Sequence, residues 1–528
     1  MMRMSIILRA VATSWIAVLA NAFAGFFLTP LILHHLGDEA FGLWILVVTV
    51  VGYYGFLDIG VGSAVVRYVS LKHALGDKEG LTRVVASAFY FYTCVCLVVV
   101  ALTFLLAPWL PRFFPVHANL IVSFRSLFLL AGVMQGLTFP LLIFGGVLQA
   151  AARFDQFYTL RIASLVFRVI AVIAACRAGG GLFAVGAAVL VPNLLYFCAQ
   201  IPLAFRAVPE ISLHPKWITK SSLHDIFGYG STTLAVTVGE QLSRNIHPLI
   251  IARFLTPVAV TLFSLPMKLL ALPLEGLSTM TAIVNPISST LEARKNLAAL
   301  RRLIQLSVQS AYLILAPIAA FLFIFGKELL SLWMGPKYVS TYPLLVLLTI
   351  GVGTAAAQFS VQSMLFGIAQ HRELMWYRLG EGLSIALLGT VFLRIWGLSG
   401  LALVSAVTLL LTNLVLIPRH LCRILSLSLR TYLEEGCLKP CVLALPFAGI
   451  LMGARWLFVV NTWPVLTLSL LAAGLTYIII LSIFIFRIQI VGMHWLSLGL
   501  FEILENKFFG TTRVKVPGAL QKVPAEQV

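Results

Sequence analysis

About fourteen stretches of roughly twenty apolar residues run through this chain, and each could cross the hydrocarbon core of a membrane as a helix. Of the 528 residues, 60% are hydrophobic and 11% are charged, whereas soluble domains carry about a quarter charged residues. Backbone groups inside a bilayer must be paired within the chain, so we expect an all-α integral membrane protein. The stretches start near residues 11, 41, 85, 120, 158, 182, 227, 257, 303, 342, 375, 398, 438 and 464.

The first half of the chain recurs in the second half at an offset of about 219 residues. Three matches in chain order carry the repeat: Pro30-Leu31-Ile32 with Pro248-Leu249-Ile250, Tyr158-x-Leu160 with Tyr377-x-Leu379, and Gly181-Leu182-x2-Val185 with Gly400-Leu401-x2-Val404. Each copy holds six crossings, an even number, so both copies should enter the membrane in the same orientation. We therefore predict two parallel-repeat six-helix lobes plus two extra C-terminal helices.

The predicted crossings divide the chain into five parts. These are an N-terminal lobe at 1–206, a cytoplasmic linker at 207–226, a C-terminal lobe at 227–420, spans 13 and 14 at 421–487, and a cytoplasmic tail at 488–528. Mixed apolar and charged faces from Leu421 to Gly436 favour a surface helix before span 13.

The basic residues lie mainly on one side of this topology. A net charge of +18 would suggest a nucleic-acid partner in a soluble chain. Here about 26 of the 37 basic residues fall in loops on one side and about seven on the other, which is the positive-inside pattern. We expect both termini to be cytoplasmic and no nucleic acid to bind. The first apolar segment is too long for a cleaved signal core and should stay as the first helix.

Catalytic motifs are absent from the sequence. Its seven cysteines are scattered, and it holds no metal-ligand cluster, no glycine-rich phosphate loop with its lysine, and no evident Ser/His/Asp set. The external loops are short, and their one acidic pair, Asp38-Glu39, is most simply a solvated turn. We predict no enzyme activity, no catalytic residue, no metal and no cofactor, and leave a proton or sodium gradient open as the energy source.

A polar stripe marks span 7. Thr233, Thr237, Glu240, Arg244 and His247 recur at three- and four-residue spacing and share one helix face. Ionisable groups inside a membrane cost several kcal/mol unless they face water or a partner. The stripe therefore predicts a water-lined cavity, and the alternative is a packed core in which Glu240 and Arg244 neutralise each other.

Other polar residues in the spans complete the candidate substrate site. Arg168 and Lys268 lie near mid-span, too deep to reach either membrane interface easily. Three glutamines, Gln149, Gln358 and Gln362, could contact sugars or only backbone.

Three acidic residues in the spans are candidates for ion pairs or for a coupling cation. Asp58 and Glu275 lie at matching places late in the second helix of each copy, and Glu381 lies in span 11. Either role fits a carboxylate inside a membrane.

Motifs in the first 90 residues resemble the polysaccharide biosynthesis (oligosaccharide flippase) family. They are Gly37-x3-Phe41-Gly42-Leu43-Trp44, Tyr53 or Tyr54, Asp58-x-Gly60, Arg67-Tyr68 and Ala74-x-Gly76-Asp77. The resemblance implies the fold of the multidrug/oligosaccharidyl-lipid/polysaccharide exporters, with a central cavity between two six-helix lobes. It further implies export of a polyprenyl-diphosphate-linked oligosaccharide across the bacterial inner membrane, for lipopolysaccharide or exopolysaccharide synthesis. For such a substrate, Arg168, Arg244 and Lys268 are the candidates to bind the anionic headgroup.

Two other functions stay open at this point. One is a cation-coupled exporter of drugs or other small molecules with the same fold, and the other is a membrane enzyme that polymerises lipid-linked sugars. Basic mid-span residues count against the first, and the lack of a large external loop counts against the second. We expect lipid-linked oligosaccharide and membrane lipids as partners, with a polysaccharide polymerase and assembly proteins as further candidates.

Overall fold

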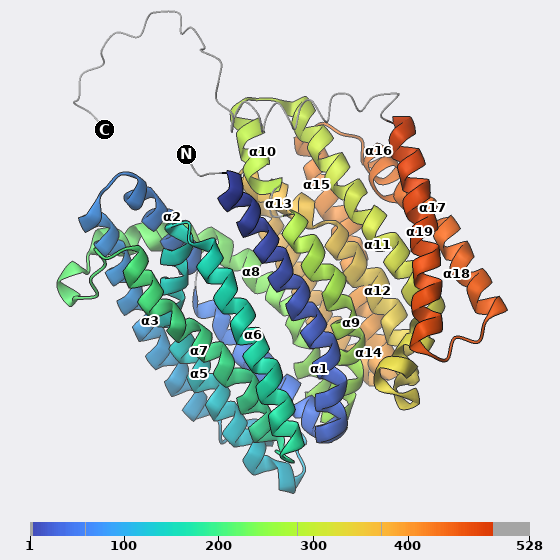
Figure 1. The fold of residues 1–528 in the computed structure, drawn as a ribbon, viewed down its shortest axis with the longest axis horizontal. Coiled ribbons are helices and arrows are strands. Elements are labelled where there is room, and N and C mark those ends of the chain that lie inside the picture. Colours follow the sequence, from blue (N-terminus) through green and yellow to red (C-terminus); the bar gives the residue numbers. More distant parts are fainter. Residues whose placement is uncertain (1–3, 59, 282–283, 371, 489–528) are drawn as a thin grey trace, which may run out of the picture.

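The protein is a bundle of long helices (Figure 1). The computed structural model describes residues 4–58, 60–281, 284–370 and 372–488. The α-helices are α1 Met4–Gly52, α2 Val61–Ala74, α3 Lys78–Leu106, α4 Leu110–Phe113, α5 Ala118–Ala150, α6 Phe154–Arg177, α7 Leu182–Ala207, α8 Lys220–Phe254, α9 Pro257–Thr281, α10 Val284–Ala293, α11 Leu297–Met334, α12 Tyr342–Ala357, α13 Phe359–Gly367, α14 Arg372–Leu410, α15 Ile417–Ile424, α16 Leu429–Leu433, α17 Lys439–Leu443, α18 Leu445–Leu457 and α19 Trp463–Ile488. Short 3-10 segments η1 Tyr53–Asp58, η2 Pro215–Trp217 and η3 Pro336–Thr341, and π-helical turns η4 Leu411–Leu416 and η5 Glu434–Leu438, connect them.

Eleven segments of the described chain are long and apolar enough to cross a membrane. Two of them contain a break that separates two crossings, at Gly37 in α1 and at Trp396–Gly397 in α14. Gly37 has φ +79°, a conformation that glycine adopts without strain and that ends the regular helix there. The more polar α8, 35 residues long, adds one more crossing, so the described residues contain fourteen. The predicted all-helical membrane fold is confirmed.

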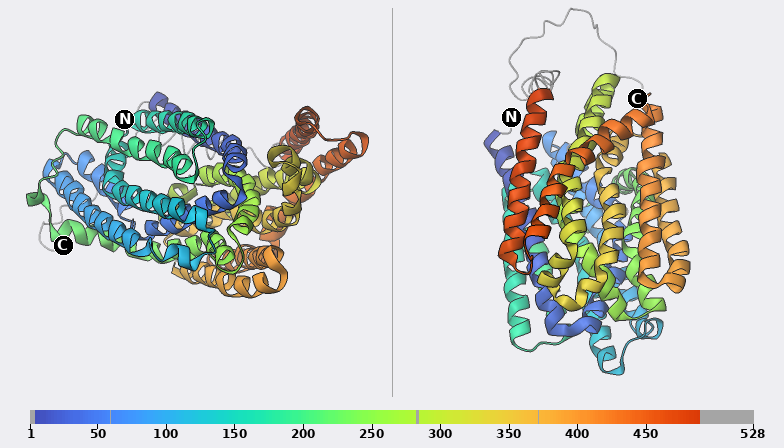
Figure 2. Two further views of the ribbon diagram at one scale, coloured as in Figure 1. Left: turned by 90° about the horizontal axis from the view of Figure 1, so that it is seen from below. Right: turned by 90° about the vertical axis from the view of Figure 1, so that its right-hand side faces the viewer.

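The helices form two groups that repeat each other. One holds α1 to α7 and the other α8 to α15, and Figure 2 shows the groups side by side, with α18 and α19 at one edge. Corresponding helices begin at the offset of the repeat: α3 begins at 78 and α11 at 297, which is 219 residues later. We call the end of the bundle where α1 begins the inner end and the opposite end the outer end. The residue boundaries assigned to the lobes and linker stay predictions.

The predicted surface helix at 421–436 is wrong as a single element. Helix α15 ends at Ile424, where Leu427 N donates to Cys422 O at 2.8 Å and Ser426 takes φ +50°. These contacts satisfy the last carbonyls of α15 and turn the chain before α16. The tail at 489–528 lies outside the described residues.

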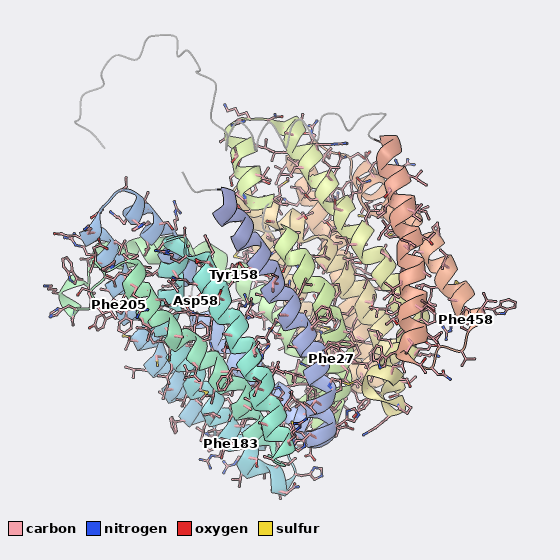
Figure 3. The ribbon with its side chains drawn as sticks, viewed as in Figure 1. Phe27, Asp58, Tyr158, Phe183, Phe205 and Phe458 are labelled. Atoms are coloured by element: carbon pink, nitrogen blue, oxygen red, sulfur yellow. The ribbon has the colours of Figure 1, made fainter. Side chains whose placement is uncertain are left out.

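Large apolar side chains cover much of the outer surface of the bundle. Phe27, Phe183 and Phe458 are 68%, 43% and 59% exposed and lie on different helices and turns (Figure 3). Monomeric soluble proteins rarely expose extensive apolar surface, so this surface fits contact with lipid.

The close crossing of α8 and α14 positions much of the polar site. A Cβ atom on Gly239 would lie 2.5 Å from the carbonyl carbon of Arg378, and one on Gly382 would lie 2.8 Å from Cβ of Leu242. Glycine at both positions lets the two backbones touch, as small residues do in membrane helix pairs. The polar side chains on the facing surfaces of these helices are thereby brought together.

Candidate functional site

The first cavity lies between the two helix groups, and we call it the interlobe chamber. It has a volume of about 320 Å³. Its polar lining comprises Asn21 and Thr29 of α1, Arg168 of α6, and Lys268 and Glu275 of α9, and Phe41 and Trp44 add aromatic walls. Because α1 and α6 belong to one group and α9 to the other, both lobes build this chamber.

The second cavity lies within the second group, and we call it the C-lobe chamber. Its volume is about 450 Å³. Its lining comes from α8, α9, α10 and α13: Glu240, Arg244, Ala271, Leu274, Glu275, Ser278, Thr281, Asn285, Phe359, Gln362, Ser363 and Phe366. Ala271 and Glu275 line both chambers, so α9 forms their shared wall.

A polar bridge crosses from one lobe to the other in the interlobe chamber. Arg168 Nη2 donates to Asn21 Oδ1 at 2.8 Å, and Asn21 Nδ2 donates to Glu275 Oε1 at 3.5 Å. Arg168 Nε is buried and has no acceptor among the described residues. Lys268 Nζ lies 5.8 Å from the centroid of the Phe41 ring, a cation–π contact. The predicted residues Arg168, Lys268 and Glu275 therefore meet at one site.

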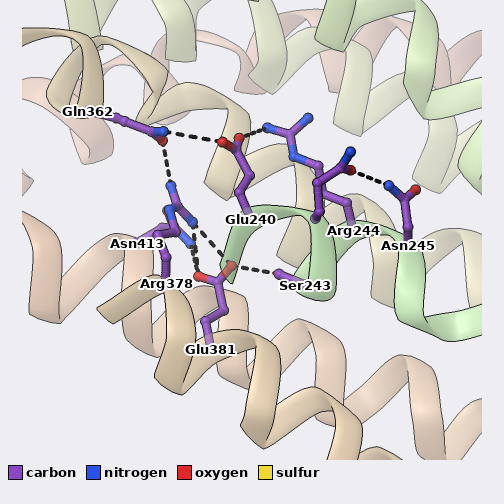
Figure 4. Close-up of polar contacts among 9 residues, drawn as sticks. Glu240, Ser243, Arg244, Asn245, Gln362, Arg378, Glu381 and Asn413 are labelled. Carbon is purple, nitrogen blue, oxygen red and sulfur yellow. Dashed lines mark hydrogen bonds and ion pairs between the residues drawn. The ribbon is translucent and has the colours of Figure 1, made fainter. Parts of the chain in front are cut away.

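A second network joins α8, α13 and α14 along the C-lobe chamber (Figure 4). Arg244 Nη2 donates to Glu240 Oε1 at 2.7 Å, and Gln362 Nε2 donates to Glu240 Oε2 at 3.4 Å. The Gln362 carbonyl in turn accepts from Arg378 Nη2 at 2.8 Å. Glu240 and Arg244 thus pair with each other and still line a cavity, which combines the two interpretations of the stripe. The side chains of Thr233 and Thr237 lie outside the described residues.

The network ends at a buried ion pair in the second lobe. Arg378 Nη1 lies 3.1 and 3.0 Å from the two carboxylate oxygens of Glu381. Glu381 also accepts from Ser243 Oγ at 2.6 Å and from Asn413 Nδ2 at 3.2 Å, so its negative charge is surrounded by donors. The two side chains are only 4% and 1% exposed. Glu381 was among the predicted residues and Arg378 was not, although the i,i+3 spacing of the two could have signalled the pair.

Three predicted site residues line neither chamber, although His247 lines a smaller neighbouring cavity of about 210 Å³ together with Glu240 and Arg244. His247 is buried and stacks on Phe263, with Nε2 2.8 Å from Ser405 Oγ. Gln358, at the break between α12 and α13, accepts from Tyr432 OH at 2.5 Å. Gln149 lies in the last turn of α5 and lines neither chamber.

Asp58 lies among the helices of the first lobe (Figure 3), at the end of η1, and lines neither chamber. Its carboxylate accepts from Tyr92 OH and, at 3.2 Å, from Gly62 N, in the first turn of α2. A carboxylate at the start of a helix stabilises the unpaired N–H groups there. This environment differs from that of Glu275, its counterpart in the repeat.

The two lobes are joined at the outer end by Asp38, in a set that we call the outer contact. The Asp38 carboxylate pairs with Lys337 and accepts from Tyr338 OH at 2.5 Å, and its backbone carbonyl accepts from Thr261 Oγ1 at 2.6 Å. Its side chain is 11% exposed, so the prediction of a solvated turn is wrong for this residue. Its neighbour Glu39 instead pairs with His117 at 2.6 Å, within the first lobe.

The sequence of this chain is similar to a protein family and to a bacterial membrane protein. Residues 35–343 match the family described as polysaccharide biosynthesis protein. The membrane protein EpsK of Bacillus subtilis (strain 168), described as uncharacterized, is 24% identical over 493 residues, covering 89% of this chain and 93% of EpsK.

Two solved structures are similar over most of the chain. The lipid II flippase MurJ, in an inward closed conformation, has a TM-score of 0.70 at 14% identity, covering 91% of this chain and 99% of MurJ. An inward-facing multidrug resistance MATE family transporter of the MOP superfamily has a TM-score of 0.65 at 13% identity, covering 81% of this chain and 99% of the transporter. At these identities the similarity establishes the fold.

Proposed function

This chain belongs to the polysaccharide biosynthesis protein family, and from that premise we propose that it is a flippase for polyprenyl-diphosphate-linked oligosaccharide in the bacterial inner membrane. The observation that carries the proposal is the interlobe chamber, where Arg168 and Lys268 face a cavity built by both lobes. A site between two lobes can open to either side of the membrane as the lobes rock, which is alternating access.

The chemistry of the chambers suits each part of such a substrate. Two bases attract a diphosphate, amide and hydroxyl groups bind sugar hydroxyls, and the polyprenyl chain can stay in the bilayer. A membrane potential that is negative inside favours outward movement of an anion by about 2.3 kcal/mol per charge per 100 mV. A proton or sodium gradient could add direction, with Glu240 and Glu275 as its candidate sites.

The topology and partners belong to the same proposal. The inner end of the bundle, where the positive-inside pattern places the basic loops, would face the cytoplasm together with both termini. A polysaccharide polymerase and assembly proteins would receive the exported cargo.

The test is transport in reconstituted proteoliposomes. A polyprenyl-diphosphate oligosaccharide loaded on one face is scored by its accessibility to a lectin or glycosidase on the other. We expect wild-type transport, a loss of about tenfold or more in Arg168→Ala and Lys268→Ala, and wild-type rates in the control Arg177→Ala, an exposed base at the outer end of α6. Absence of wild-type transport of any lipid-linked sugar, with or without ion gradients, would contradict the proposal.

A second candidate is a cation-coupled exporter of small molecules. The acidic side chains of Glu240 and Glu275 in the C-lobe chamber favour it, because they could bind a cationic drug or a coupling ion. Efflux of a cationic dye from the same liposomes, without movement of lipid-linked sugar, would select this function.

A further inference from the structure

The two chambers differ in charge. The interlobe chamber holds two bases, Arg168 and Lys268, and one acid, Glu275. The C-lobe chamber holds one base, Arg244, and two acids, Glu240 and the shared Glu275. An anion is therefore attracted to the first chamber and repelled from the second.

The bases also differ in how fully they are neutralised. Arg244 is paired with Glu240 at 2.7 Å. Lys268 forms no ion pair within 4.0 Å among the residues that the structure describes, and its Nζ atom instead lies over the Phe41 ring. A diphosphate can therefore approach Lys268 without displacing an existing ion pair.

The uncharged lining of the C-lobe chamber offers a different chemistry. Asn285 is exposed to the cavity, and the hydroxyls of Ser278 and Ser363 donate to backbone carbonyls at 2.9 Å, which leaves their lone pairs free to accept. Phe359 and Phe366 add aromatic faces. Hydroxyl-binding groups beside flat apolar faces fit a sugar ring, which carries hydroxyls on its rim and C–H groups on its faces.

The chambers are placed so that one ligand can occupy both. They share the wall formed by Ala271 and Glu275 of α9, and each volume lies within the range of about 300–1,000 Å³ that is usual for small-molecule sites. In a lipid-linked sugar, the first sugar is bonded directly to the diphosphate, so the two groups must bind in adjoining spaces.

We propose that the chambers divide the substrate: the interlobe chamber binds the diphosphate, and the C-lobe chamber binds and selects the first sugar. The inference rests on the proposed flippase function and adds to it a specificity site. Asn285 and Phe359 are its specificity-determining residues, whereas Arg168 and Lys268 bind every diphosphate regardless of the sugar.

The test compares two ligands on purified protein. Farnesyl diphosphate carries no sugar, and farnesyl-diphospho-sugars are made with glucose, galactose or N-acetylglucosamine. For each sugar, the dissociation constant of farnesyl diphosphate divided by that of the farnesyl-diphospho-sugar measures how much the sugar adds to binding. The C-lobe variants are Asn285→Ala and Phe359→Leu, and their control is Asn461→Ala, which makes the asparagine change at an exposed outer turn. The variant of the interlobe chamber is Lys268→Gln, and its control is Arg177→Gln at an exposed base.

We expect Asn285→Ala and Phe359→Leu to weaken binding of the preferred sugar ligand about tenfold and to leave farnesyl diphosphate binding unchanged. Lys268→Gln should weaken both ligands equally, and the two controls should bind like wild type. Farnesyl diphosphate binding also reports that each variant is folded.

Two results would overturn the proposal, and they are distinguishable. If wild type binds both ligands but the C-lobe variants keep the sugar ratio, or lose both ligands alike, the division of the substrate is wrong and the flippase function stands. If wild type binds neither ligand and moves no lipid-linked sugar, the flippase function fails, and the division fails with it.

Discussion

Glu381 is the most completely surrounded charge in the described part of the second lobe. Its carboxylate accepts hydrogen bonds from Arg378, Ser243 and Asn413, and it is 1% exposed. Such an arrangement is stable only while every partner is present, since a buried charge without its counter-charge is costly. Its partner Arg378 also donates to Gln362, which donates to Glu240, so hydrogen bonds link the buried pair to the C-lobe chamber.

We expect Glu381→Gln to destabilise the protein by about 3–5 kcal/mol, because Arg378 would remain buried without a counter-charge. The thermal unfolding midpoint in detergent measures the effect. Glu373→Gln is the matched control on the same helix, since Glu373 is 60% exposed in its pair with His420 and should contribute less than about 1 kcal/mol.

Replacing both partners should restore much of the stability. The double change Arg378→Met and Glu381→Leu removes the unpaired charge together with its partner. An unfolding midpoint for Glu381→Gln equal to that of wild type would show that Arg378 finds other compensation.

At the scale of elements, the crossing of α8 and α14 depends on two glycines. Gly382 faces Cβ of Leu242 and, at 3.0 Å from the position of a Cβ, the carbonyl oxygen of Gly239. Gly380, two residues earlier on the same helix, has nothing within 4 Å of that position. Replacing each glycine separately therefore distinguishes the cost of disturbing a close helix contact from the effect of helix propensity alone.

We expect Gly382→Ala to destabilise the protein by about 1–3 kcal/mol, because the neighbouring backbone cannot move aside easily. Gly380→Ala should be neutral or stabilise by up to about 1 kcal/mol, since alanine is the better helix former. Thermal unfolding in detergent gives both values. Equal effects of the two changes would contradict a close crossing at Gly382.

At the scale of the whole molecule, the outer contact holds the two lobes together. Asp38 belongs to the first lobe, while Thr261, Lys337 and Tyr338 belong to the second. A carrier that alternates between two openings must break such contacts when it opens outward. Under the proposed alternating access, the energy of these contacts therefore biases the balance between the inward-open and outward-open states.

We expect Asp38→Asn to favour the outward-open state, because it removes the ion pair with Lys337. The measure is labelling of Thr29→Cys, which lines the interlobe chamber, by a membrane-impermeant maleimide added from outside, with the seven native cysteines replaced. The labelling rate should rise about threefold or more. Glu39→Gln, which breaks a pair within one lobe, is the control; a rise as large in this control would contradict the role of Asp38.

Most of the fold could be predicted from the sequence, and the candidate site could be predicted in part. Span length, the 219-residue repeat and the family resemblance are patterns in the order of the residues, which a sequence displays directly. Depth in the membrane likewise marked Arg168, Lys268, Glu275 and Glu240 as candidates.

What only the tertiary structure decided is which of these side chains meet. Arg168 and Glu275 lie on helices more than a hundred residues apart in the chain and are connected through Asn21. Arg378 was not among the predicted site residues, and the crossing of α8 and α14 buries it. Asp38 was predicted to lie in a solvated turn, and its contacts with η3 largely bury it. Helical periodicity determines which residues share a face of one helix. Which face meets which neighbour depends on packing between distant segments, and that packing created the two chambers.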